Sequence, residues 1–258
     1  MINNKITFVE KLIKDYPKKR SFLPKEYNKI YKNFCLYARS DKGFVKKIFK
    51  KFTNWMHLKV SDNEKFKILE YGSGNLNHLQ FEKYLIYDVV EPTKYLFESS
   101  SKKNLINQYY QFLEEIPNDN RYDKIISIAT LEHLINLPYD LAKLSLMLNK
   151  NGKFKHSIPS EGSFLWFISS RYISGTNFFL RFRLNFDTLL RHEHVNSAKE
   201  IEQSIRFFFN KVKIKRFPFP FFHLSIFTYL EASSINKDNV NLFLSKYTKN
   251  YIKEDFEY

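Results

Sequence analysis

The sequence contains little glycine, a single cysteine and no long apolar run. The lone thiol, Cys35, excludes a disulfide within the chain and a cysteine-rich zinc site. No stretch approaches the roughly 18 apolar residues of a membrane-spanning helix. The N-terminus also lacks the apolar core of a secretory signal peptide. We therefore expect a soluble, cytoplasmic protein, and its 258 residues are enough to bury a core without covalent cross-links.

Acidic residues are scarce in the first quarter of the chain. Residues 1–65 hold 17 Lys and Arg against 6 Asp and Glu, and the whole chain has a net charge of +15. A basic surface attracts phosphates, nucleic acid or anionic lipid headgroups. Lysine outnumbers arginine 33 to 9, however, which a biased coding composition also produces. Nucleic-acid readers often favour arginine, so RNA binding is the weaker interpretation.

Hydrophobic periodicity divides the chain into three parts. Apolar residues at helical spacing make 1–64 a basic helical extension, and the charged residues 236–258 form a helical tail. Between them, 65–235 alternates strands with helices, which predicts βαβ units and a parallel sheet. The clearest strands are 66–71, 84–91, 122–129 and 153–158.

The later part of this middle region departs from the alternation. A helix is expected over 131–148, with an interruption near Pro138. Two β-type runs, 211–217 and 223–231, have no helix between them and predict an antiparallel hairpin at the sheet edge. Residues 163–196 are rich in aromatic side chains. We expect them to form a helical insert packed on the sheet, which could cap an acceptor or touch a membrane surface.

Two of the six glycines, Gly72 and Gly74, occur in one turn after the first strand. Glycine there permits positive φ and a close approach of the backbone to a ligand. Glu91 closes the second strand, where a carboxylate can hold a ribose diol. Glu70 adds a carboxylate that opposes a pyrophosphate but suits a sulfonium. Asn77 replaces the third glycine of a dinucleotide fingerprint, and the charge of Glu70 favours S-adenosylmethionine (SAM) over NAD.

These segments resemble class I SAM-dependent methyltransferases, in particular their small-molecule, type 11/12-like branch. The similarity covers about 65–160, and more loosely 192–231. It implies a Rossmann-like α/β fold with a seven-stranded, mostly parallel sheet and an antiparallel last strand. The matching segments, in family order, are Ile68–Asn75, Val90–Thr93, Glu114–Pro117, Tyr122–Ser127, Thr130–Leu134 with its Leu-Glu-His, and Leu148–Phe154.

The resemblance also implies positions for the cofactor. The methionine part of SAM would lie against Glu70, Gly72, Ser73, Gly74, Ile128 and Ala129. The ribose would bind Glu91, and the adenine would lie beside Phe112 and Leu113. Arg39 is a candidate for the cofactor carboxylate. Leu76 stands where the family often has glycine, so the helix after the loop is expected to begin differently.

Three histidines are candidates for a general base or an acceptor ligand: His194, His133 and His192. No metal site is expected, because no third ligand accompanies the two histidines of the His192-Glu193-His194 run. We expect methyl transfer to an oxygen of a small molecule or sugar, including phosphate-bearing or surface-glycan precursors. The alternatives are an RNA methyltransferase that uses the basic extension and an inactive fold that binds SAM or a partner. Nothing in the sequence indicates an oligomeric state.

Overall fold

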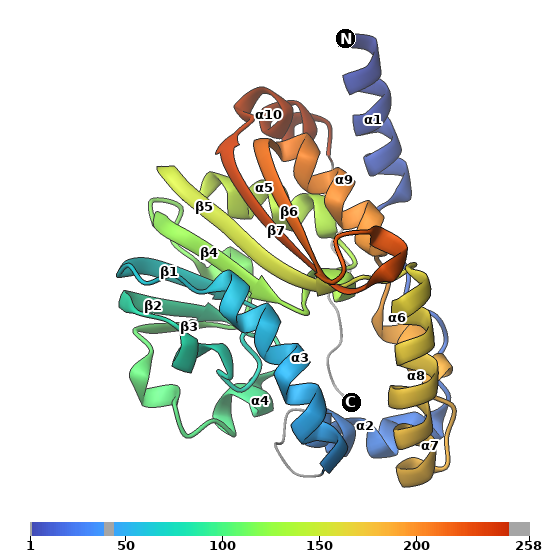
Figure 1. The fold of residues 1–258 in the computed structure, drawn as a ribbon. Helices are drawn as coiled ribbons and strands as arrows, with labels where there is room; N and C mark the ends of the chain where they lie inside the picture. Colours follow the sequence, from blue (N-terminus) through green and yellow to red (C-terminus); the bar gives the residue numbers. More distant parts are fainter. Residues whose placement is uncertain (1, 39–43, 248–258) are drawn as a thin grey trace.

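The computed structural model describes residues 2–38 and 44–247, with side chains for 6–34 and 52–247. A seven-stranded sheet of order β3-β2-β1-β4-β5-β7-β6 forms the centre (Figure 1). Strands β1 to β5 are parallel, and β7 runs antiparallel between β5 and β6. The strands are β1 (Phe66–Tyr71), β2 (Tyr84–Val90), β3 (Gln108–Tyr110), β4 (Tyr122–Ile128), β5 (Leu148–Pro159), β6 (Phe209–Pro218) and β7 (Ser225–Ile235).

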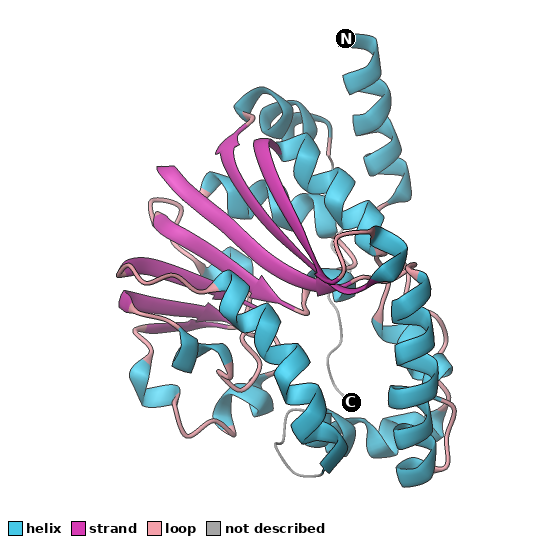
Figure 2. Cartoon of the chain, viewed as in Figure 1, coloured by secondary structure: helices cyan, strands magenta, loops and turns pink. Residues whose placement is uncertain are grey.

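Helices cover both faces of the sheet (Figure 2). One face packs against α1, α5, α9 and α10 in the largest core cluster, which includes Leu12, Leu141, Ile205 and Phe243. The other face packs against α3 and α4 through Trp55, Val60 and Phe97. These helices are α1 (Ile2–Asp15), α3 (Phe44–Val60), α4 (Lys94–Glu98), α5 (Leu137–Leu146), α9 (Ala198–Phe208) and α10 (Lys237–Lys246).

The predicted architecture is confirmed in its strands and in the late hairpin, but two helices differ. The helix expected from 131 begins only at Leu137, because Leu131–His133 forms a separate 3₁₀ turn, η4, and Pro138 suits the first turn of the new helix. After the glycine loop, the chain forms only a 3₁₀ turn, η1 (His78–Phe81). The expected irregularity at Leu76 is also present, because this buried leucine adopts φ 63°.

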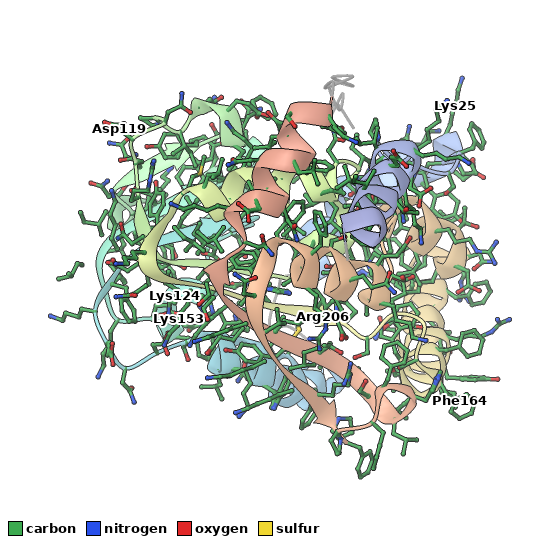
Figure 3. All side chains as sticks on the ribbon, turned by 90° about the horizontal axis from the view of Figure 1, so that it is seen from above. Lys25, Asp119, Lys124, Lys153, Phe164 and Arg206 are labelled. Atoms are coloured by element: carbon green, nitrogen blue, oxygen red, sulfur yellow. The ribbon has the colours of Figure 1, made fainter. Side chains whose placement is uncertain are left out.

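Buried ion pairs hold α3 on its face of the sheet. Lys124 of β4 is 1% exposed, and its Nζ lies 2.6 Å from Glu82 and 3.2 Å from Asp62, just after α3 (Figure 3). Lys155 of β5 binds the other Asp62 oxygen over 2.6 Å. His78 extends the network to Glu82 over 2.8 Å. Charges this deeply buried are tolerated because each has an opposite partner.

The aromatic insert packs against the N-terminal extension as well as the sheet. It consists of α6 (Phe164–Ser169), the π-helical turn η5 (Ser170–Gly175), α7 (Thr176–Phe182) and α8 (Phe186–Glu193). Phe178 and Leu189 form a small core with Tyr27 of α2 (Lys25–Ala38), while α6 lies beside β7. The expectation of an insert packed on the sheet alone is therefore incomplete.

The outer side of the insert remains apolar and exposed. Phe164, the first residue of α6, is 60% exposed and lies at the edge of the insert helices (Figure 3). Phe167, Tyr172 and Phe179 are exposed as well. None of the described helices is both long and apolar enough to cross a membrane. Membrane contact at this surface stays a prediction.

Candidate functional site

The sheet register brings the glycine loop and Glu91 together. Tyr71, the last residue of β1, pairs with Val90, the last residue of β2. The loop then turns back over β2, because Gly72 N donates to the Val90 carbonyl over 2.8 Å. On the other side, β1 pairs with β4 through Glu70 and Ile126. The carboxyl ends of β1, β2 and β4 thus form one crevice, the usual ligand position in open α/β sheets.

Gly72 is required here on two grounds. Its φ of 78° is unfavourable for residues with a side chain, and an added Cβ would lie 2.3 Å from Cγ2 of Thr130. Gly74 also has positive φ, at 54°. Thr130 follows β4, so the loop is fitted directly against the segment that leads to Glu132 and His133. The glycine loop and the segment after β4 are therefore neighbours.

Glu91 is buried and anchors the loop. Its Oε2 accepts from Gly74 N over 2.6 Å, and its Oε1 accepts from Thr93 N over 2.8 Å. Tyr109 also donates to the Glu91 carbonyl over 2.9 Å. Carboxylate oxygens only accept hydrogen bonds, and ligand hydroxyls can donate them. The position suits a ribose diol.

Glu70 lies at the crevice but faces Tyr87. The Tyr87 hydroxyl donates to its carboxyl over 2.8 Å, and Glu70 is 3% exposed. Burial raises the pKa of Glu70 to about 8, against the lowering effect of the Tyr87 hydrogen bond. Glu70 is therefore largely protonated at neutral pH in the free protein. A nearby cationic ligand would favour its ionised form.

The remaining predicted cofactor positions differ in accessibility. Ser73 is buried, and its hydroxyl has no hydrogen-bond partner among the described residues, so a ligand group there would satisfy it. Phe112 is 37% exposed, whereas the Leu113 side chain belongs to the main core and leaves only its backbone for adenine. Ile128 is half-buried, and Ala129 is exposed with φ 50°. Arg39 lies outside the described residues.

Glu132, His133 and His194 form a second group, the Glu-His-His cluster. One ligand atom from each side chain lies within 4.8 Å of the other two. The rings of His133 and His194 meet edge to face at 4.9 Å, and His133 Nε2 lies 3.9 Å from Glu132 Oε1. Trp166 of the insert stacks over His194 at 6.4 Å. The aromatic insert therefore borders this cluster.

Backbone hydrogen bonds join the two segments of this cluster. Val195 N and Asn196 N donate to the Glu132 carbonyl over 2.9 and 3.0 Å. Asn196 Nδ2 donates to the carbonyls of Leu131 and Leu134 over 3.0 and 2.6 Å. Two segments about 60 residues apart in the sequence are thereby fixed side by side.

Residues 16–21, the N-terminal strap, hold these segments from outside. Arg20 donates to the carbonyls of His133, His192 and Glu193 over 3.0 to 3.2 Å. Lys18 Nζ donates to the Val195 carbonyl over 2.8 Å and pairs with Glu200 over 2.6 Å. Two of the basic residues that suggested phosphate binding thus contact the chain itself.

His192 is not part of the cluster. Its Nδ1 donates to the Ser21 carbonyl over 2.7 Å, and the residue is 8% exposed at the end of α8. Of the three candidate histidines, the fold brings together only His133 and His194.

The surroundings of the cluster are strongly acidic. Glu132 is 2% exposed, neither of its carboxyl oxygens has a hydrogen-bond partner among the described residues, and burial raises its pKa to about 7. Burial lowers the pKa of His194, but its hydrogen bond to Glu161 and the charges of Glu132, Glu161 and Glu193 outweigh this, so the net shift is upward. The site favours positive charge.

Comparisons with known proteins identify the fold. A SAM-dependent methyltransferase from Thermotoga maritima, described as a possible histamine N-methyltransferase, superposes with a TM-score of 0.54 and 14% identity. The match covers 81% of this chain and 97% of that chain. The chain has the class I methyltransferase fold.

Two other solved structures with this methyltransferase fold are also similar. A SAM-dependent methyltransferase from Clostridium acetobutylicum has a TM-score of 0.47 and 12% identity, covering 81% of this chain and 99% of that one. The plantazolicin methyltransferase in complex with S-adenosylhomocysteine (SAH) has a TM-score of 0.49 and 11% identity. The match covers 88% of this chain and 99% of that one. No protein-family model matches the sequence, and no curated protein matches it significantly.

Within this methyltransferase fold, sequence reasoning missed several residues of the site. Glu132 lies in the Leu131-Glu132-His133 segment, but only His133 was predicted to be a functional residue. Tyr87 and Thr130 could not be assigned because their partners come from other strands. Glu161 and Arg20 gave no sequence signal, since their contacts with His194 and the His133 carbonyl depend on the tertiary fold.

Proposed function

We propose that this chain is a SAM-dependent methyltransferase acting on an oxygen of a small molecule or sugar. The observation that carries the proposal is the buried Glu91 carboxylate, 2.6 Å from the N–H of Gly74 in the loop after β1. A buried carboxylate beside a glycine turn at neighbouring strand ends supports binding of a ribose diol there. The unpartnered Ser73 hydroxyl and the bare Gly72 backbone fit a polar nucleoside there.

When bound, SAM supplies a methyl group on a positively charged sulfur. The chain's own residues hold the reactants in line and exclude water. Glu91 fixes the nucleoside, and Glu70 offers a carboxyl that ionises more readily beside a cation. Glu132 and His133 of the Glu-His-His cluster follow Thr130 directly in the sequence, and Thr130 contacts Gly72, so we assign the cluster to the acceptor.

The oxygen of a hydroxyl acceptor bonds to the methyl carbon, the carbon–sulfur bond breaks with its electron pair on sulfur, and the hydroxyl proton passes to water or to a base. The Glu-His-His cluster is the polar group to which we assign this oxygen. Its aromatic border, including Trp166, supports an acceptor with an apolar or ring-shaped part. Because Lys18 and Arg20 bind within the chain, the basic extension has less free charge for RNA than its composition suggests.

The test combines binding with transfer. SAH and NAD are titrated into the full chain by calorimetry, and labelled SAM is incubated with separate pools of small molecules, lipid-linked glycans and RNA. We expect SAH to bind, NAD not to bind, and label to enter a hydroxyl compound. Label on a nitrogen or on RNA would overturn the acceptor class. Absence of SAH binding would overturn the function.

A further inference from the structure

We propose that Glu132, His133 and His194 bind a divalent transition-metal ion, which receives the acceptor oxygen. The metal site stands on its own geometry, whereas its role toward an acceptor rests on the proposed function. The three ligand atoms lie within 4.8 Å of one another, although their residues come from two distant segments.

The tautomers of the two histidines suit metal binding. His133 Nδ1 lies 2.9 Å from the Glu193 carbonyl, which can only accept, so this nitrogen carries the proton. His194 Nδ1 donates in the same way to Glu161 over 2.8 Å. In each neutral ring the lone pair is then on Nε2. Metal-binding histidines characteristically donate their other N–H to a carbonyl or carboxylate.

Glu132 provides the independent observation. It is 2% exposed, and neither carboxyl oxygen has a hydrogen-bond partner among the described residues. A buried carboxyl without a partner is costly, and a cation bound to it removes that cost. Glu161 and Glu193 add further negative charge beside the two rings.

The distances fit a small ion after modest adjustment. Ligands about 2.1 Å from a tetrahedral Zn²⁺ lie about 3.4 Å apart. Glu132 Oε1 and His133 Nε2 are 3.9 Å apart and the three ligand atoms lie within 4.8 Å, so side-chain rotation must bring the ligands closer around an ion. Two imidazoles and one carboxylate are typical of Zn²⁺, Fe²⁺ or Mn²⁺, whereas Mg²⁺ prefers oxygen ligands.

Three protein ligands leave coordination positions open for the acceptor. The His133 side chain is 31% exposed, whereas Glu132 is buried, so the open side faces solvent. A hydroxyl on the ion becomes more acidic and loses its proton to water. Its oxygen then bonds to the methyl carbon while the sulfur keeps the electron pair of the broken bond.

The experiment uses the full chain after treatment with a chelator. Zn²⁺, Mn²⁺ and Mg²⁺ are titrated by calorimetry, and Co²⁺ is followed by its visible absorption. We expect one Zn²⁺ or Mn²⁺ per chain and weaker Mg²⁺ binding. Glu132→Gln and His194→Ala should each reduce affinity at least about 100-fold, and Glu161→Gln about tenfold. His223→Ala, an exposed histidine outside the cluster, should bind like the parent chain.

Circular dichroism is used to check that each variant is folded. If a ligand variant unfolds, Glu161→Gln still tests the site, because Glu161 only orients His194. Zn²⁺ binding that is absent, or unchanged in the folded variants, would overturn the site. SAH titration of the same samples separates the two proposals. Binding of SAH without metal removes only the metal site, and binding of metal without SAH removes only the methyltransferase function.

Discussion

Thr130, at the end of β4, packs directly against the bare α-carbon of Gly72 in the glycine loop. A Cβ on Gly72 would lie 2.3 Å from Thr130 Cγ2 and 2.4 Å from its hydroxyl oxygen. The contact leaves no room for a side chain at position 72.

Gly72→Ala is expected to destabilise the fold and to abolish SAH binding. Positive φ costs about 1–2 kcal/mol for alanine, and overpacking against Thr130 adds about 1–3 kcal/mol. Urea denaturation and calorimetry measure the two effects. Gly175→Ala is the matched control, since φ there is −64° and its Cβ would meet only ordinary contacts from 3.4 Å. A Gly72→Ala protein as stable as this control would disprove the constraint.

Glu91→Ala should weaken SAH binding by at least about tenfold. The change removes the acceptor of two backbone N–H groups, and hydrogen bonds to a charged group contribute about 1.5–3 kcal/mol each. Calorimetry gives the affinity and thermal unfolding gives the stability. Glu98→Gln is the control, because this exposed carboxylate makes only a 3.6 Å surface pair with Lys94. Equal affinities in the two variants would remove Glu91 from the ribose site.

Glu70 should make stability fall as pH rises. Its pKa is about 8 in the fold and 4.5 in a model peptide, because burial outweighs the Tyr87 hydrogen bond. The folded state then binds more protons between these values. The contribution of Glu70 to the free energy of unfolding is complete below pH 4.5 and is lost toward pH 8. The free energy of unfolding falls by up to about 1.4 kcal/mol per pH unit in this range.

Urea denaturation between pH 5 and 8 measures this slope, and Glu70→Gln should flatten it. The charges of Glu82 and Glu91 raise the same pKa and that of Lys102 lowers it, so the comparison with Glu70→Gln isolates Glu70. SAM affinity should rise with pH in the parent chain but not in Glu70→Gln. Parallel profiles for both proteins would contradict this assignment.

His156→Leu should stabilise the protein. His156 is fully buried beside Phe154, and neither ring nitrogen has a hydrogen-bond partner among the described residues. Burial lowers its pKa to about 3 from 6.5, so the unfolded chain binds the extra proton and stability falls as pH drops below 6.5. Leucine removes the unsatisfied imidazole, whose burial lowers the free energy of unfolding by about 1–3 kcal/mol.

Thermal unfolding at pH 5 and pH 7 tests this expectation. The gain should be larger at pH 5, and His223→Leu at the exposed η6 turn (Phe222–Leu224) should change little. A destabilised His156→Leu protein would show that the ring has a partner or a packing role.

Local patterns predicted the sheet and the proximity of the glycine turn to Glu91. The glycine turn, Glu91 and the late hairpin depend on strand ends, whose positions follow from periodicity and from Gly and Pro. The start of the helix expected over 131–148 was wrong, because Asn196 donates hydrogen bonds to the carbonyls of Leu131 and Leu134, which no local pattern encodes. For the same reason the sequence did not place Glu132 and His133 beside His194.

The sequence shows how many basic residues the chain has, but not which contacts they make. Lys124 and Lys155 look like ordinary solvated residues in the sequence, yet they are buried against Asp62 and Glu82. Their partners come from separate elements, so only the assembled sheet defines these pairs.

The Arg20 contacts have a consequence for how the Glu-His-His cluster can change. Arg20 donates to the carbonyls of Glu193 and His133, two residues that border or belong to the cluster. Substitutions at Arg20 can therefore move the backbone around His133 without any change in the cluster residues themselves. The form of the cluster thus depends on a segment that is far from it in the sequence.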